Sequence, residues 1–288
     1  MESNFLTAIF LPLALFIIML GMGLGLTLED FKRVMTEPKA VVLGLIAQLL
    51  MLPMVGFLLA SLLALSPELA VGVMILAACP GGSTSNLISY LVKGNVALSI
   101  TLTAVSSVIT IVTIPLVVNL SANYFVGENV ALQLPVARTI LQIAVITLIP
   151  IGIGMACHYK FPKLAMVIEQ KVKWLSLFFL GMIIVGILLK ERENLASFFL
   201  QVGGVTVALN LLTMALGYGL ALGAGLDLPE RKSITVEVGI QNGTLAIAIA
   251  TTLLSNPMMA IPAAIYSLVM FLTSAIFAGV LKFQGIKS

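Results

Sequence analysis

The sequence predicts an all-α polytopic membrane protein with nine transmembrane helices, and two observations lead to that fold class. Of the 288 residues, 60% are hydrophobic and only 9% are charged, whereas a soluble domain carries about 25% charged residues. The apolar residues also form long unbroken runs, while strands of a membrane barrel would alternate polar and apolar positions. This composition excludes a soluble enzyme and an intrinsically disordered chain. The net charge of +3 is too small and scattered for a nucleic-acid surface, so no nucleic-acid partner is expected.

Each predicted span is a run of about 20 mainly apolar residues, the length that crosses the hydrocarbon layer. In order, the spans are residues 5–26, 40–64, 69–92, 96–120, 135–157, 174–189, 198–226, 233–255 and 260–281. The first run follows an acidic start and is too long for the apolar region of a signal peptide, so we interpret it as a helix. Cys79 and Cys157 have no partner spacing, and neither a disulfide framework nor a zinc site is expected.

The basic residues predict the orientation, because cytoplasmic loops carry an excess of lysine and arginine. Twelve of the 15 basic residues fall on one side of the predicted spans, and three fall on the other. The larger group is Lys32, Arg33, Lys39, Lys93, Lys160, Lys163, Lys171, Lys173, Arg231, Lys232, Lys282 and Lys287. We therefore expect the N-terminus outside and the C-terminus in the cytoplasm.

Polar residues and glycines interrupt the third and eighth spans. The third contains Cys79-Pro-Gly-Gly-Ser-Thr-Ser-Asn86, and the eighth contains Thr235-Val-Glu-Val-Gly-Ile-Gln-Asn-Gly-Thr244. Pro80 removes a backbone donor, and Glu237 is the only acidic residue inside a predicted span. Such breaks are tolerated at membrane depth only where they are buried in protein or line a cavity. We therefore expect the two broken helices to meet in the interior.

The two interrupted spans run in opposite directions, which is typical of an inverted-topology repeat. In such transporters, broken helices bind anions through free N–H groups and cations through carbonyls and a carboxylate. Ser99 and Thr103 lie one turn apart on the fourth span, and their hydroxyls are hard ligands for a small cation. Simpler interpretations remain open at this point. The breaks are also compatible with kinks, and these hydroxyls and Gln48 with helix packing. Glu237 is also compatible with a proton relay or with a neutral, hydrogen-bonded side chain.

At these residues the sequence resembles the bile acid:sodium symporter family, which includes bacterial homologues of the apical sodium-dependent bile acid transporter. The resemblance covers essentially the whole chain. It rests on the two interrupted segments and on three further motifs. These are Lys93-Gly-Asn-Val-Ala-Leu-Ser99, Gly21-Met-Gly23 with Asp30-Phe31, and Ala47-Gln48 before Pro53.

The resemblance implies a single transporter unit over residues 1–288, with a repeat of four spans plus five. Its core domain would comprise residues 40–120 and 198–281, its panel domain residues 5–26 and 135–189, and the broken helices would cross in the core. It also implies two Na⁺ ions. The first sodium site would be Ser85, Asn86, Ser99, Thr103 and Glu237. The second would be Gln48, Glu237, Gln241 and the carbonyls of Val238 and Ile240. The substrate would lie against Ser83, Thr84 and Asn242.

The function that the resemblance implies is sodium-coupled symport of a small organic anion, such as a bile acid-like or pantoate-like carboxylate. The expected location is the bacterial cytoplasmic (inner) membrane, with the lipid bilayer but no obligatory protein partner around the chain. A proton-coupled anion carrier is the first alternative, and an anion-binding channel or sensor is the second. Met270 and Phe271 stand where some relatives have a His-Asn pair, which weakens the transfer of bile-acid specificity. The sequence offers no catalytic constellation, so we expect no enzyme.

Overall fold

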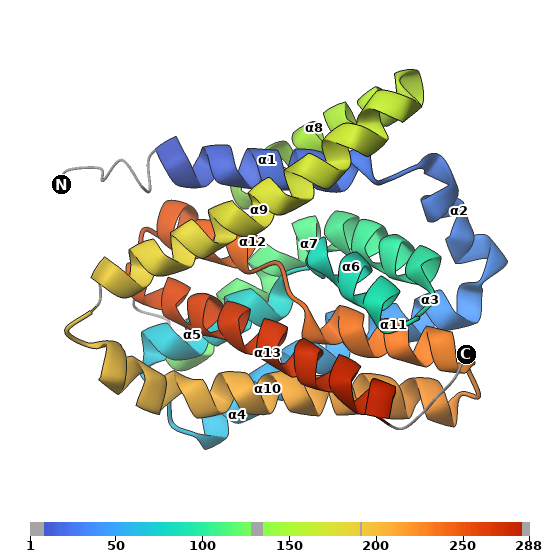
Figure 1. The fold of residues 1–288 in the computed structure, drawn as a ribbon. Coiled ribbons are helices and arrows are strands. Elements are labelled where there is room, and N and C mark those ends of the chain that lie inside the picture. Colours follow the sequence, from blue (N-terminus) through green and yellow to red (C-terminus); the bar gives the residue numbers. More distant parts are fainter. Residues whose placement is uncertain (1–8, 128–134, 191, 284–288) are drawn as a thin grey trace.

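The computed structural model describes residues 9–127, 135–190 and 192–283, and helices account for nearly all of them (Figure 1). Lys287 and the first four residues of the predicted span 5–26 lie outside the described residues. In chain order the elements are α1 (Leu11–Leu24), α2 (Leu28–Thr36), α3 (Pro38–Ile46), the π-helical turn η2 (Ala47–Met51), α4 (Leu52–Leu62), α5 (Pro67–Ala78), α6 (Thr84–Leu91), α7 (Val96–Phe125), α8 (Val136–Lys160), α9 (Pro162–Lys190), α10 (Leu195–Gly223), α11 (Leu228–Gly239), α12 (Gly243–Ala248), the π-helical turn η3 (Ile249–Leu253), the 3₁₀ turn η4 (Pro257–Ala260) and α13 (Ile261–Phe283).

Long apolar helices make up most of the fold. Among the described residues, six helical stretches are long and apolar enough to cross a membrane, and a seventh qualifies if α1 and α2 form one span bent by 62°. The predicted all-helical membrane fold is therefore confirmed. The helical pieces of the interrupted third and eighth spans are each too short to be counted among these helices. The total of nine transmembrane spans therefore stays a prediction.

The sixth predicted span, 174–189, is wrong in its extent. α9 is one helix of 29 residues that begins at Pro162, so Lys163, Lys171 and Lys173 belong to a helix and not to a loop. The predicted span starts only at Trp174, after these charged residues. Charged residues do not end a helix, and a pair one turn apart supports it. Here Glu169 and Lys173 form such an i,i+4 ion pair of 2.6 Å.

The two interrupted segments lie against each other. The Gly82 N–H donates to the Ile240 carbonyl at 2.9 Å, and the Asn242 N–H donates to the Pro80 carbonyl at 3.0 Å. They form an isolated antiparallel bridge between Gly81 and Gln241. A buried break leaves backbone groups that need partners, and here each break supplies them to the other.

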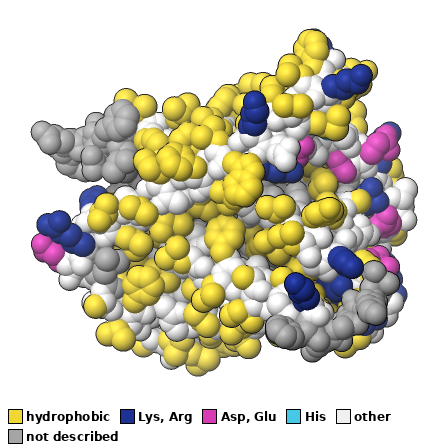
Figure 2. Space-filling view, viewed as in Figure 1, with side chains coloured by type: hydrophobic (Ala, Val, Ile, Leu, Met, Phe, Trp, Pro, Cys, Tyr) yellow, Lys and Arg dark blue, Asp and Glu magenta, His cyan; other side chains and the backbone are white. Residues whose placement is uncertain are grey.

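The site lies in a molecule with a distinct layer of three helices and a largely apolar surface. α1, α8 and α9 lie together along one side of the molecule, above the other helices (Figure 1), and α1 packs closely on both of the others. In the same view, hydrophobic side chains cover the middle of the surface, whereas charged side chains gather over the right-hand part and at the left tip (Figure 2). An apolar band of this kind is what a bilayer requires, because lipid tails solvate no charge.

Candidate functional site

Glu237 is the centre of a fully buried oxygen cluster. Its side chain has 0% exposure and lies on α11, just before the break. The Thr103 hydroxyl donates to Oε1 at 2.5 Å, and the Ser99 hydroxyl donates to Oε2 at 2.9 Å. Both hydroxyls come from α7, where their i,i+4 spacing places them on one face. The carboxylate also packs tightly on the first break, because a Cβ at Gly81 would lie 2.1 Å from Oε1.

Ser85, at the start of α6, extends this cluster, and Asn86 is the next residue along the helix. The Ser85 hydroxyl is 3.4 Å from Ser99 Oγ and 3.3 Å from Thr103 Oγ1, which is long for a hydroxyl hydrogen bond of about 2.7–2.8 Å. The Asn86 Oδ1 atom is buried and has no hydrogen-bond partner among the described residues. This oxygen therefore has unused acceptor capacity at the start of α6.

Gln48 and Gln241 form a second polar contact across the molecule. Gln48 lies in the π-helical turn η2, a local distortion that is frequent at functional sites. Its Nε2 donates to Gln241 Oε1 at 2.7 Å and to the Cys79 carbonyl at 3.1 Å. Gln241 Nε2 donates to the Val238 carbonyl at 2.9 Å. The groups assigned to a second sodium site thus lie close together, but they bond to one another.

Glu237 does not join this second group. Its carboxylate accepts from Ser99 and Thr103 of α7, and the Ile240 carbonyl accepts from the Gly82 N–H. A cation at this position would have to use the remaining lone pairs of the carbonyl and amide oxygens.

Ser83, Thr84 and Asn242, the predicted substrate contacts, line one narrow cavity of about 30 Å³. Its other walls include Ile18 of α1 and Ser176 of α9. The Asn242 side chain caps α12 by accepting from the Leu245 N–H at 3.0 Å. Its Nδ2 is buried without a hydrogen-bond partner among the described residues, so an N–H donor is available at this cavity.

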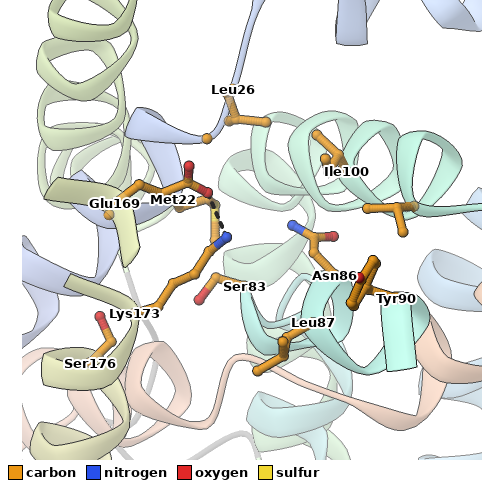
Figure 3. Close-up of a pocket in the computed structure, with 13 residues that line it drawn as sticks. Met22, Leu26, Ser83, Asn86, Leu87, Tyr90, Ile100, Glu169, Lys173 and Ser176 are labelled. Atoms are coloured by element: carbon orange, nitrogen blue, oxygen red, sulfur yellow. Dashed lines mark ion pairs between the residues drawn. The ribbon is translucent and has the colours of Figure 1, made fainter. Parts of the chain in front are cut away.

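A wider pocket of about 280 Å³ shares Ser83 and Ser176 with the narrow cavity. It lies between α1 and α9 on one side and α6 and α7 on the other (Figure 3). Its lining comprises Gly21, Met22, Gly25, Leu26, Ser83, Asn86, Leu87, Tyr90, Val96, Ile100, Glu169, Lys173 and Ser176. The two cavities together follow the boundary between these helices as far as the two breaks.

Sequence reasoning missed several polar groups near the site. Asn210 of α10 donates to the Gly239 carbonyl at 2.7 Å, and the Tyr266 hydroxyl donates to the same carbonyl at 3.0 Å. These side chains support the last carbonyl of α11. An asparagine inside an apolar span was the available signal for Asn210. Glu169, Lys173 and Ser176 were missed as pocket residues, although their i, i+4, i+7 spacing places them on one helix face.

The chemistry of the cluster suits a small hard cation. Carboxylate, hydroxyl and amide oxygens are the ligands that such cations prefer. None of the ion pairs among the described residues includes Glu237, although a buried charge is stable only when it is paired or solvated. The same residues contain no cluster of three or more His, Cys, Asp or Glu side chains that could hold a metal ion. The residues present therefore fit a monovalent ion held by a single carboxylate.

Comparison with known proteins points to one family. Residues 12–198 match the model of the Sodium Bile acid symporter family. The chain is 36% identical over 260 residues to a Bacillus subtilis protein named "Uncharacterized sodium-dependent transporter YocS", covering 90% of this chain and 78% of that protein. It is 34% identical over 274 residues to "Probable sodium/metabolite cotransporter BASS2, chloroplastic" of Oryza sativa subsp. japonica, covering 93% and 63%. It is 33% identical over 243 residues to human "Sodium/bile acid cotransporter 4", covering 84% of this chain and 55% of that protein.

Proposed function

The chain belongs to the Sodium Bile acid symporter family, and from this premise we propose that it carries a small organic anion across the membrane together with sodium. The family and these relatives are transporters and not enzymes. Membership supports sodium coupling as a class of activity. The substrate, the ions' positions and the transport cycle are our proposals.

The observation that carries the proposal is the environment of Glu237. A buried carboxylate with two short hydroxyl contacts and no ion pair among the described residues is best explained by a cation that completes the site. We propose that Na⁺ binds to Glu237, Ser99, Thr103 and Ser85, with the unpartnered Asn86 oxygen as a further ligand. A second Na⁺ would bind at Gln48 and Gln241 with the carbonyls of Val238 and Ile240.

The substrate is proposed to bind where the two breaks meet. Ser83, Thr84 and Asn242 line the narrow cavity there, and Asn242 offers an unpaired N–H donor. Sodium would hold the broken segments in place and so organise these donors for a substrate that extends from the narrow cavity into the adjoining wider pocket. Each ion that enters down a potential of 100 mV contributes about 2.3 kcal/mol. Two ions with one monovalent anion would therefore make transport electrogenic.

Alternating access would proceed by movement between two units. The layer of α1, α8 and α9 (Figure 1) supports the panel domain, residues 5–26 and 135–189, with the remaining spans as the core. Three broken spans, α1–α2, α5–α6 and α11–α12–η3, can be added to the six long helical stretches. The total is then nine spans, and the repeat is four spans plus five. We place the protein in a bacterial inner membrane, with the C-terminus in the cytoplasm on the basis of the basic loops.

The deciding experiment compares the wild type with Glu237→Gln, which removes the charge but keeps size and hydrogen-bonding capacity. Thermal unfolding of the detergent-purified protein is measured in NaCl and in choline chloride at one pH, because a ligand that binds the folded state stabilises it. We expect sodium to raise the melting temperature of the wild type clearly more than that of the variant, which keeps only the second proposed site. Counterflow of pantoate in proteoliposomes should fall about ten-fold or more in the variant, since hydrogen bonds to charged groups contribute about 1.5–3 kcal/mol.

The controls separate this proposal from its alternatives. Glu193→Gln changes an exposed glutamate and should leave the sodium response intact. Transport that persists in choline and follows a pH gradient would favour proton coupling in place of sodium coupling. An unchanged sodium response in Glu237→Gln would remove the proposed cation site.

A further inference from the structure

The wider pocket contains one ion pair, formed by the only charged residues in its lining. Lys173 Nζ and Glu169 Oε1 are 2.6 Å apart, and their side chains are 44% and 20% exposed. Glu169 is the more tightly packed partner. Its Oε1 lies so close to Gly25 that a Cβ added there would be only 2.7 Å away. Lys173 has the freer end. An ammonium group has three donors, so the pair with Glu169 leaves Lys173 with capacity for another acceptor.

A second donor faces Lys173 from the other wall. The Lys173 ammonium and the Asn86 amide nitrogen point into the pocket from opposite sides (Figure 3). Lys173 belongs to α9 and Asn86 to α6, so the two donors come from the two sets of helices that bound the pocket. The pocket that separates these two sets of helices has a volume of about 280 Å³. An acceptor with two oxygens, such as a carboxylate, matches a pair of donors placed in this way.

The rest of the lining limits the size and character of a ligand. Met22, Leu26, Leu87 and Ile100 provide an apolar surface, and Ser83 and Ser176 add hydroxyls. Pockets for drug-sized ligands hold about 300–1,000 Å³, so this pocket of about 280 Å³ lies just below that range. It suits a short, branched or hydroxylated acid better than a steroid skeleton.

We propose that Lys173 is a specificity-determining residue that binds the substrate carboxylate together with Asn86, and that the substrates are small monocarboxylates. This inference rests on the proposed function and names its substrate class. Glu169 then has a defined role. It neutralises Lys173 in the empty pocket and opposes the incoming anion, because like charges in a partly buried site repel. The pair thus keeps carboxylate binding weak enough for release.

This arrangement predicts opposite effects for the two members of the ion pair. Lys173→Met removes the attractive group and should weaken carboxylate binding roughly ten-fold or more, the scale of a lost hydrogen bond to a charged group. Glu169→Gln removes the opposing charge and should tighten binding. Lys173→Arg keeps the charge and should retain most of the affinity. Lys171→Met changes an exposed lysine outside the pocket lining and should behave like the wild type.

The test measures melting temperature against concentration for pantoate, lactate, isovalerate, pyruvate and taurocholate, each in NaCl and in choline chloride, with isovaleramide as a neutral control. We expect sodium-dependent stabilisation by small monocarboxylates and none by isovaleramide. In Lys173→Met, sodium alone should stabilise the protein as it does the wild type, while the carboxylate response moves to higher concentration.

Several results would overturn the inference and leave the proposed function intact. In one, Lys173→Met and Glu169→Gln weaken binding equally, which would mean that the ion pair only supports α9. In another, sodium stabilises the wild type but no small monocarboxylate adds to it. Taurocholate binding as tightly as the small acids would overturn the size limit. Conversely, a Lys173-dependent pantoate response without any sodium effect would overturn sodium coupling and leave this inference standing.

Discussion

Gln48 and Gln241 show how two neutral side chains hold distant parts of the chain together. Both are buried, and 193 positions separate them in the sequence. Their reciprocal amide contacts of 2.7 and 3.3 Å connect η2 to the break after α11. A buried amide needs its partners, because an unsatisfied group costs about 1–3 kcal/mol. The pair therefore couples the second proposed sodium site to the position of the break.

Gln48→Ala tests this coupling. The substitution removes the donor to Gln241 and to the Cys79 carbonyl, so the second cation should bind more weakly while the cluster at Glu237 stays intact. We expect the Hill coefficient for sodium, measured from thermal stabilisation or uptake, to fall towards one. The unfolding free energy should fall by about 1–3 kcal/mol, the cost of the unsatisfied Gln241 amide.

Gln201→Ala is the matched control, because Gln201 is exposed and bonds only to Ser197 of its own helix. It should change neither the cooperativity nor the stability appreciably. A wild-type sodium dependence in Gln48→Ala would show that Gln48 serves packing alone.

At the scale of elements, α1 and α8 approach closely through two small residues. A Cβ at Gly23 would lie 2.2 Å from the Ile151 carbonyl oxygen, and one at Gly154 would lie 2.5 Å from the Leu20 carbonyl oxygen. Backbone atoms cannot move aside as a side chain would. Small residues at such contacts let membrane helices pack by van der Waals contact, where no hydrophobic effect drives association. This contact holds α8 against α1, which lines the substrate pocket.

Gly23→Ala should therefore separate the two helices. We expect a destabilisation of about 1–3 kcal/mol, as for overpacking in a well-packed interior, measured as a lower melting temperature in detergent. Transport should also decrease, because Met22 and Gly25 of the same segment line the pocket. Gly219→Ala provides the comparison, since a Cβ there meets open space and alanine favours a helix by about 0.5–1 kcal/mol. Equal melting temperatures for the two variants would contradict the packing argument.

For the whole molecule, the two cavities indicate which end of the transporter is open. The wide pocket is lined by Gly25 and Leu26 at the end of α1 and by Val96 at the start of α7. That end also carries Lys32, Arg33 and Lys93, which the basic-residue distribution assigns to the cytoplasm. The cavity narrows to about 30 Å³ at the breaks. We therefore expect this arrangement to correspond to a state that is open to the cytoplasm.

Cysteine labelling tests that expectation in a background without Cys79 and Cys157. Ser83→Cys, at the shared wall of both cavities, should react with a membrane-impermeant maleimide in inside-out vesicles but not in right-side-out ones. Sodium with pantoate should slow the reaction by covering the residue.

Leu63→Cys, at the exposed end of α4, should show the opposite sidedness and serves as the reference. If Ser83→Cys were labelled only from the outside, one of the two assignments would be wrong. The labelling side of Leu63→Cys would show whether it is the orientation of the chain or the end at which the pocket opens.

Much of the fold was accessible from the sequence because the physics of a bilayer is simple. Apolar runs long enough to cross it predicted α7, α8, α10 and α13 to within a few residues. Glycine, proline and polar residues in the same short segments located both breaks. The extent of α9 was misjudged, because its charged first half was treated as a loop, although those residues belong to one helix.

What the sequence determined by itself was therefore the class of protein, the position of each break and the isolation of one carboxylate, Glu237, inside an apolar span. Each of these depends on a residue and its neighbours along the chain. The breaks were expected to meet, and the family resemblance already grouped Thr103, 134 residues away, with that carboxylate. Only the tertiary structure decided which atoms make these contacts, namely the Thr103 hydroxyl on Oε1 and the paired backbone groups of the two breaks. It alone also placed Lys173 opposite Asn86 across a pocket. These contacts depend on how helices rotate and pack against one another, and one-dimensional spacing does not specify that.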